Sequence, residues 1–167
     1  MKKYQKGMTL VELILYIALL SLFIGGAISF AWDIIYGRVK SNTQRALSQN
    51  LRIASRRISY EIRNSTAFSI PNASTLSLTL ADSTRNPTVI DLSGGRVRIG
   101  YGSSGPCPVL TPCFLTSNEL TISNLMFTNL SSGGSTNVQI SIAGELTGPR
   151  QEYKLQDSYQ TSVELRK

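Results

Sequence analysis

The longest hydrophobic stretch of the chain lies close to its N-terminus. From Leu13 to Trp32, twenty consecutive residues carry no charge. An α-helix of this length, rising about 1.5 Å per residue, would cross the roughly 30 Å hydrocarbon core of a membrane. Apolar residues surround this helix on every side, whereas a helix on the surface of a soluble domain has one apolar face. The stretch therefore predicts a membrane-spanning helix, and a buried helix of a soluble protein is the less favoured alternative.

After Trp32 the pattern changes to that of an amphipathic helix. Apolar residues recur at steps of mostly three and four, at Val39, Leu47, Leu51, Ala54, Ile58 and Ile62. A second face carries Arg45, Arg52, Arg56 and Arg63. We expect the apolar face to pack and the arginine face to be solvated or to meet acidic groups of neighbouring molecules. Nucleic acid, whose phosphates such arginines could neutralise, is a less favoured partner.

Short segments typical of β-strands follow from about Ser69. The expected strands are a segment around Leu76, Leu78 and Leu80 and the ranges 88–92, 96–101, 119–122, 125–129, 138–143, 152–155 and 159–165. Gly94 and Gly95 separate two of these strands and favour a tight hairpin, because glycine readily adopts a positive φ. A long helix followed only by strands predicts an α+β fold, in which antiparallel strands lie against the polar half of the helix.

The net charge adds little to this picture. The chain has 17 Lys and Arg against 10 Asp and Glu, a formal charge of +7. Lys2, Lys3 and Lys6 all precede Gly7, so a chain that begins after Gly7 would have 14 basic and 10 acidic residues, or +4. Such a charge is compatible with anionic lipid or nucleic acid as a partner, but solubility alone explains it.

The composition offers little material for catalysis. Histidine is absent, which removes the commonest general base and the imidazole metal ligand. The acidic residues after the helix are scattered and form no short calcium-binding loop. The glycine-rich segment 100–105 has no lysine after it and leads into proline, unlike a phosphate-binding loop. We therefore predict no catalytic residue, no metal site and no cofactor, and a protein that is not an enzyme.

Two cysteines, Cys107 and Cys113, lie in a proline-rich stretch. Five residues separate them, which lets the chain fold back so that the two sulfurs meet. An even number of cysteines outside the cytosol favours a disulfide. Together with the membrane segment this predicts a disulfide, and two unpaired thiols are the alternative.

A peptidase could cut the N-terminal region at two places. Gly7 stands before the apolar stretch, whereas Ser29-Phe30-Ala31 resembles a secretory cleavage site and would release a protein that begins at Trp32. The stretch is longer than the roughly 7–15 apolar residues of a secretory signal. Glu12, close to the start of the stretch, needs a cationic partner in lipid. Cleavage after Gly7 would supply one, the new α-amino group of Met8, and this site is therefore favoured.

Taken together, these residues closely resemble the N-terminus of type IV pilins and pseudopilins. In that family a basic leader ending in glycine precedes a hydrophobic residue, and glutamate is fifth after the cut. Here the leader is Lys2-Lys3-Tyr-Gln-Lys-Gly7, and Met8-Thr-Leu-Val-Glu12 follows, with Met8 in place of the more usual phenylalanine. The resemblance implies that a prepilin peptidase cuts after Gly7 and that the amine of Met8 is methylated. It also implies that Glu12 guides assembly by pairing with the N-terminus of a neighbouring subunit.

The resemblance further implies an architecture and a location. The expected parts are a leader at 1–7, a transmembrane and assembly helix at 8–32, an amphipathic helix at 33–66 and a β-rich globular head at 67–167. One helix would hold the chain in the cytoplasmic membrane, with the C-terminal head outside the cytoplasm, until an inner-membrane assembly platform transfers it to a pilus or pseudopilus. The implied partners are prepilin peptidase, this platform, membrane lipid and other subunits.

Later segments narrow the resemblance to minor subunits. The segments 55–63, 125–130 and 159–166 look like the minor pseudopilins of the J type and related minor pilins. Major pilins usually carry a proline about two-thirds along the helix, where this chain has Gly25-Gly26. The expected function is that of a minor pilin or pseudopilin that initiates or caps a type IV pilus or a type II secretion pseudopilus. The alternatives are a DNA-uptake pseudopilin and a membrane-anchored binding protein that does not assemble, and a secreted enzyme released after Ala31 is the least favoured.

Overall fold

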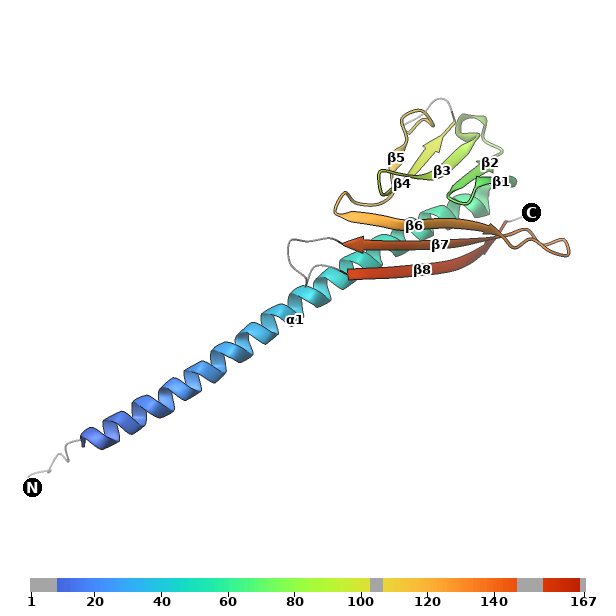
Figure 1. Ribbon diagram of the computed structural model, residues 1–167. Coiled ribbons are helices and arrows are strands. Elements are labelled where there is room, and N and C mark those ends of the chain that lie inside the picture. Colours follow the sequence, from blue (N-terminus) through green and yellow to red (C-terminus); the bar gives the residue numbers. More distant parts are fainter. Residues whose placement is uncertain (1–8, 103–106, 147–154, 166–167) are drawn as a thin grey trace, which may run out of the picture. The chain divides into compact units, whose positions relative to one another are not determined.

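The computed structural model describes residues 9–102, 107–146 and 155–165 (Figure 1). The described part begins with a long helix, α1 (Leu10–Asn64), and has a 3₁₀ turn, η1 (Ser83–Arg85). The strands are β1 (Ala67–Asn72), β2 (Thr75–Thr79), β3 (Thr88–Ser93), β4 (Arg96–Tyr101), β5 (Cys113–Phe114), β6 (Leu120–Asn129), β7 (Asn137–Leu146) and β8 (Leu155–Glu164). Five strands form one antiparallel sheet in the order β1-β2-β3-β4-β5, and three form a second in the order β6-β7-β8. The predicted α+β arrangement, a long helix packed on antiparallel sheets, is confirmed.

Two compact units divide the chain, one of residues 1–40 and one of residues 41–167, and α1 contributes to both. In the first unit the large apolar side chains of α1 are exposed. The most apolar 18-residue window of the helix has a mean hydropathy of 2.4, and none of that window is buried. By length and composition, α1 is the one helix of the described part that could cross a membrane. A helix that is apolar all round needs lipid or other helices as its surroundings.

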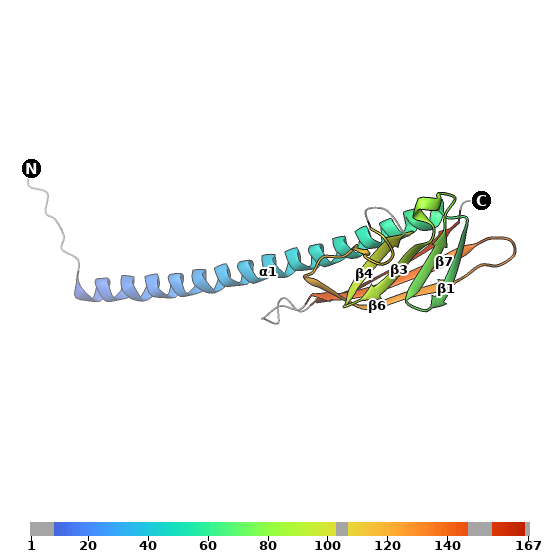
Figure 2. The same cartoon turned by 90° about the horizontal axis from the view of Figure 1, so that it is seen from above.

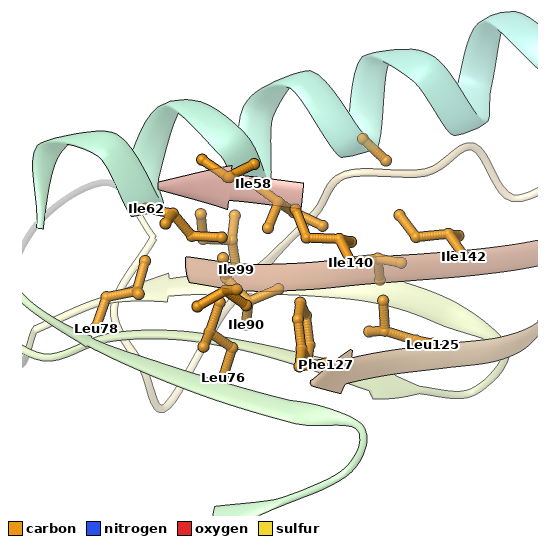
Figure 3. Packing of buried hydrophobic residues seen from close by; sticks show 14 of the residues in the cluster. Ile58, Ile62, Leu76, Leu78, Ile90, Ile99, Leu125, Phe127, Ile140 and Ile142 are labelled. Carbon is orange, nitrogen blue, oxygen red and sulfur yellow. The ribbon is translucent and has the colours of Figure 1, made fainter. Parts of the chain in front are cut away.

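In the second unit, residues 41–64 of α1 lie along one face of the strands (Figures 1 and 2). Its apolar face supplies Leu47, Leu51, Ala54, Ile58 and Ile62, all of which are buried. These side chains meet residues of both sheets in one hydrophobic core (Figure 3). Fully burying each leucine or isoleucine stabilises the fold by about 1.5–3 kcal/mol. The predicted packing face is thus confirmed for these five residues, whereas Val39 belongs to the first unit and is only partly buried.

The tight hairpin predicted at Gly94 and Gly95 is present. Both glycines have positive φ, 57° and 70°, and they connect Ser93 of β3 directly to its partner Arg96 of β4. A two-residue turn of this kind suits the right-handed twist of the strands. The hairpin places β4 next to β3 and so leads the chain towards the two cysteines.

The strand boundaries differ from the prediction in several places. The two strands expected at 119–122 and 125–129 are one strand, β6, because a bulge between Ile122 and Asn124 shifts the register without ending the pairing with β7. The strand expected at 159–165 begins earlier, at Leu155, and β8 is continuously paired with β7. Of the strand expected at 152–155, residues 152–154 lie outside the described residues. The prediction missed two strands, β1 and the two-residue β5.

α1 closely approaches a glycine of β7 in the second sheet. A Cβ atom on Gly144 would lie 3.1 Å from Cδ1 of Ile122 and 3.3 Å from Cδ2 of Leu51. Such distances are tighter than ordinary van der Waals contacts, so a side chain at this position would push against the core. The absence of a side chain at Gly144 therefore lets α1 and β7 pack closely against each other.

Candidate functional site

The first turn of α1 carries the predicted assembly residue. Glu12 is exposed, and its backbone N–H donates a hydrogen bond to Oγ1 of Thr9 at 3.3 Å. A carboxylate near a helix N-terminus is favoured by the helix dipole. Among the described residues no side chain pairs with the Glu12 carboxylate, and the predicted processing residues Gly7 and Met8 lie outside the described residues. The predicted pairing between Glu12 and a new N-terminus therefore stays a prediction.

The polar side chains within the apolar part of α1 bond to their own helix. The hydroxyl of Ser21 donates to the carbonyl oxygen of Ala18 at 2.9 Å, and the hydroxyl of Ser29 donates to the carbonyl oxygen of Gly25 at 3.1 Å. In hydrocarbon an unsatisfied hydroxyl would cost several kcal/mol, so such internal bonds suit a helix that has no water around it. The helix also continues without interruption through Gly25 and Gly26.

An aromatic pair follows the most apolar part of the helix. The rings of Trp32 and Tyr36 are stacked with their centroids 6.0 Å apart, and both side chains are exposed. Trp and Tyr are enriched where a membrane meets water, because their rings are apolar and their N–H and O–H groups are polar. Asp33 and Arg38, the first charged residues after the apolar stretch, lie in the same region. The order of apolar, aromatic and charged residues is compatible with a helix that leaves a membrane in this region.

Comparison with known families bears directly on this segment. Residues 2–28 match the family model of the prokaryotic N-terminal methylation motif. The chain carries a prepilin-type methylation motif. The matched range includes Gly7, Met8 and Glu12 and supports a place for the chain in the type IV pilin and pseudopilin family. No curated protein and no solved structure is significantly similar to it.

The prepilin-type segment is compatible with a single-pass membrane anchor, since the exposed apolar helix lies near the N-terminus. The residues of its motif all come from the first 28 positions. The arginine face from Arg45 onwards and the disulfide lie in the second unit, beyond the matched residues.

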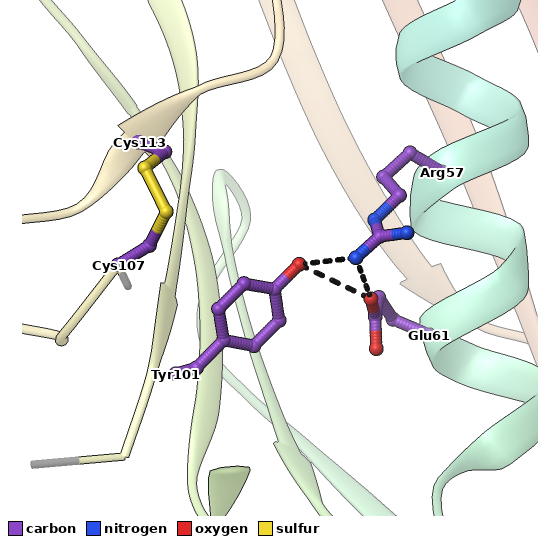
Figure 4. The surroundings of a disulfide bond; sticks show 5 residues. All are labelled: Arg57, Glu61, Tyr101, Cys107 and Cys113. Atoms are coloured by element: carbon purple, nitrogen blue, oxygen red, sulfur yellow. Dashed lines mark hydrogen bonds and ion pairs between the residues drawn. A yellow bond between two sulfur atoms is a disulfide. The ribbon is translucent and has the colours of Figure 1, made fainter. Parts of the chain in front are cut away.

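A buried carboxylate lies between α1 and the first sheet of the pilin-like head. Glu61 has no exposed side-chain surface, and its Oε1 atom lies 3.0 Å from Nη2 of Arg57, one turn earlier. Its Oε2 atom accepts a hydrogen bond of 2.7 Å from Arg85. The hydroxyl of Tyr101 donates to Oε1 at 3.2 Å and accepts from Arg57 at 2.7 Å (Figure 4). These four residues, the Glu61 cluster, tie α1 to η1 and β4.

The cluster satisfies every charge that it buries. Arg57 is 45% exposed and Arg85 31%, so both cations keep contact with water while they neutralise Glu61. The hydrogen bond with the Tyr101 hydroxyl raises the pKa of Arg57 above its ordinary value. The guanidinium of Arg85 also lies 4.8 Å from the centroid of the Tyr101 ring, a cation–π contact. This arrangement holds the fold together and leaves Glu61 no access to solvent.

The sequence analysis missed the Glu61 cluster. One local signal was available, the spacing of Arg57 and Glu61 by four residues, which predicts an ion pair on a helix. Glu61 also falls beside Ile58 and Ile62, on the face predicted to pack. Neither signal identifies Arg85 or Tyr101, because they join the cluster only through the pairing of strands far along the chain.

The predicted disulfide between Cys107 and Cys113 is present (Figure 4). Both ends of the loop that it closes are attached to β4. The N–H of Tyr101 donates to the carbonyl oxygen of Cys107 at 2.7 Å, and Cys113 pairs with Ile99. The disulfide therefore stabilises the strand that carries the Tyr101 side chain into the Glu61 cluster.

The arginine face of α1 is exposed, as predicted. Arg45, Arg52, Arg56 and Arg63 all have solvent-accessible side chains. None of the four forms an ion pair with another residue of the described part of the chain.

The other candidate sites considered in the sequence are a glycine-rich loop and a metal site. The glycine-rich segment 100–105 begins inside β4, and a Cβ atom on Gly100 would lie 2.7 Å from Cα of Val109, so this glycine packs against the backbone. Across residues 9–102, 107–146 and 155–165, no three His, Cys, Asp or Glu side chains converge as metal ligands do.

Proposed function

We propose that this chain is a minor pilin or pseudopilin, a structural subunit that initiates or caps a type IV pilus or a type II secretion pseudopilus. One observation carries the proposal. The methylation motif at residues 2–28 coincides with the start of an exposed helix that is uncharged from Leu13 to Trp32 and whose first turn contains Glu12. In this role the chain is a building block and not an enzyme.

The mechanism that we propose is one of processing followed by transfer. Prepilin peptidase cuts after Gly7, and the amine of Met8 becomes methylated. The apolar helix holds the subunit in the cytoplasmic membrane, with its head outside the cytoplasm. An assembly platform then transfers the helix to a bundle of similar helices, which buries again the apolar surface that lipid had covered. Glu12 sets the axial register, because an unpaired carboxylate among apolar helices is costly.

The minor rather than the major role is supported by two features. The helix has no proline in its apolar part and continues through Gly25-Gly26, unlike the major pilins described above. The segments 55–63 and 125–130 resemble J-type minor pseudopilins, and in the structure they form the end of α1 and part of β6. Glu61, which belongs to the first segment, has a structural role in the head.

A second candidate, a DNA-uptake pseudopilin, has one observation in its favour. Four exposed arginines of α1, none paired within the described residues, could neutralise phosphates of nucleic acid. Between these arginines the sequence has one aromatic residue, Tyr60, whose ring centroid lies 5.5 Å from the guanidinium of Arg57. One such ring is not a series of stacking surfaces for bases, which keeps this candidate second.

The decisive experiment is the intact mass and N-terminal sequence of the protein isolated from its own membranes. We expect a chain that begins at Met8 with a methylated amine. The matched control is a Gly7→Leu variant, whose leader should remain uncut. A chain that begins at Trp32 would overturn the proposal, because a secreted protein without the apolar helix cannot join a helical bundle.

A further inference from the structure

The last strand of the second sheet has an open edge. In the order β6-β7-β8, β8 pairs with β7 and with no other strand of the described part of the chain. The N–H of Leu165 donates to the carbonyl oxygen of Thr136 at 2.9 Å, and this bond shows which alternate residues of β8 are hydrogen-bonded to β7. Because antiparallel pairs alternate, the odd-numbered residues of β8 bond to β7. The backbone groups of Gln156, Ser158, Gln160, Ser162 and Glu164 therefore point away from the sheet.

The other edges of the described sheets are protected, and that of β8 is not. β1 contains Pro71 and a register shift between Ser69 and Asn72, and β5 has two residues. On the side of β6 that faces away from β7, the N–H groups of Ile122 and Phe127 donate to the carbonyl oxygens of Gly95 and Ala73. β8 is ten residues long, with neither proline nor bulge. Proline, bulges and short length are the usual means of preventing strand addition, so β8 is the edge that can accept a strand.

The arginine face of α1 borders this open edge. The hydroxyl of Ser48 donates to Oδ2 of Asp157 at 2.6 Å, near the start of β8. At the other end, Arg63 and Glu164 line one open cavity of about 760 Å³. From Ser48 to Arg63 the helix advances about 22 Å, and from Asp157 to Glu164 the strand advances about 23 Å. Helix and strand thus run side by side in the same direction over this distance.

The border between them is rich in positive charge. Arg45 and Arg52 line a second cavity, of about 310 Å³, around Ser48. Arg45, Arg52 and Arg63 of the arginine face thus lie along the border, whereas β8 contributes the carboxylates of Asp157 and Glu164. One of these, Asp157, already accepts the hydrogen bond from Ser48. The side of the open edge that faces α1 is therefore suited to an anionic partner.

We propose that β8 binds an extended segment of a partner protein, which adds to the sheet as a further strand and carries acidic side chains at alternate positions. Its backbone would bond to the free groups of β8, and its acidic side chains would lie on the side of α1, next to the arginines. At about 3.3 Å per residue, roughly eight residues fill the edge between the two cavities. This binding goes beyond the proposed role of the chain and does not depend on filament assembly.

The test uses the full-length protein in zwitterionic detergent micelles and two labelled ten-residue peptides, one of alternating Glu and Thr and one of alternating Lys and Thr. We expect the acidic peptide to bind at least about tenfold more tightly by fluorescence anisotropy. Gln160→Pro removes one edge donor and should weaken binding about fivefold or more, whereas Gln160→Ala keeps the donor and should not. Likewise Arg52→Glu should weaken binding and Arg52→Lys should not.

Hydrogen exchange on the unmodified protein gives a readout that does not require any variant to fold. The acidic peptide should slow exchange of the backbone amides of residues 156–164. Equal binding of the two peptides, or binding without this protection, would overturn the proposal. Binding of single-stranded DNA that Arg52→Glu abolishes and Gln160→Pro leaves intact would assign the arginines to nucleic acid instead. Self-association that Gln160→Pro abolishes, without peptide binding, would assign the edge to a second copy of the chain.

Discussion

The Nη2 atom of Arg85 lies 2.7 Å from Oε2 of Glu61, although 24 positions separate the two residues in the sequence. Glu61 belongs to the helix and Arg85 to the short turn that precedes β3. A fully buried carboxylate must be paired, because an unpaired charge in the interior costs several kcal/mol. The contact therefore specifies where the first sheet lies on residues 41–64 of α1.

Glu61→Gln should destabilise the head. The variant keeps the size of the side chain but removes the charge that pairs with Arg57 and Arg85. Because both arginines can turn to solvent, we expect a loss of about 1–3 kcal/mol in the free energy of unfolding, less than for a wholly buried pair. Urea unfolding followed by circular dichroism measures it. Glu164→Gln, on the exposed end of β8, is the matched control and should change stability by less than about 0.5 kcal/mol.

Removal of the disulfide should also lower stability. Cys107 and Cys113 are six positions apart, and closing a loop of this length stabilises the folded state by about 2 kcal/mol in the chain-entropy model. A double Cys107→Ser, Cys113→Ser variant should lose about this much in urea unfolding. Reduction of the unmodified protein is the control, since it should give the same midpoint as the double variant. Equal midpoints for the oxidised protein and the double variant would mean that the disulfide does not stabilise the head.

Gly144→Val should disturb the contact between helix and second sheet. The added carbon atoms would press on Leu51 of α1 and Ile122 of β6, and overpacking of this kind costs about 1–3 kcal/mol. Ala143→Val, at the neighbouring position on the opposite face of β7, is the control. Thermal unfolding should show a lower midpoint for the first variant and little change for the second. Similar midpoints for both variants would contradict the close approach of α1 to β7.

Glu12→Ala should separate processing from assembly. In the proposed mechanism the peptidase acts at Gly7, so the variant should still be cut. Its incorporation into filaments should fall about tenfold or more, because no carboxylate pairs with the neighbouring N-terminus. Immunoblots of membranes and of sheared filaments measure the two steps, with Glu12→Asp as the charge-preserving control. Normal incorporation of Glu12→Ala would rule out pairing through this residue.

Local patterns along the sequence predicted most of the fold. The periodicity of α1 identified Leu47, Leu51 and Ile58 as core residues, and the two glycines identified the β3–β4 hairpin, because both signals lie within a few neighbouring residues. The Glu61 cluster was missed because its members meet only through long-range packing. The bulge in β6 was missed for a related reason, since Ile122 and Asn124 stay in one strand only because β7 continues beside them.

The internal hydrogen bonds of Ser21 and Ser29 bear on the energy of moving α1 between environments. Each hydroxyl is satisfied by a carbonyl of its own helix and needs neither lipid headgroup nor neighbour. In the proposed transfer from bilayer to filament, these bonds would persist. The energetic difference between the two states would then come from packing, from the fit of one helix surface against others, and from Glu12. The two hydroxyls would accordingly neither favour nor oppose exchange of this helix between lipid and protein.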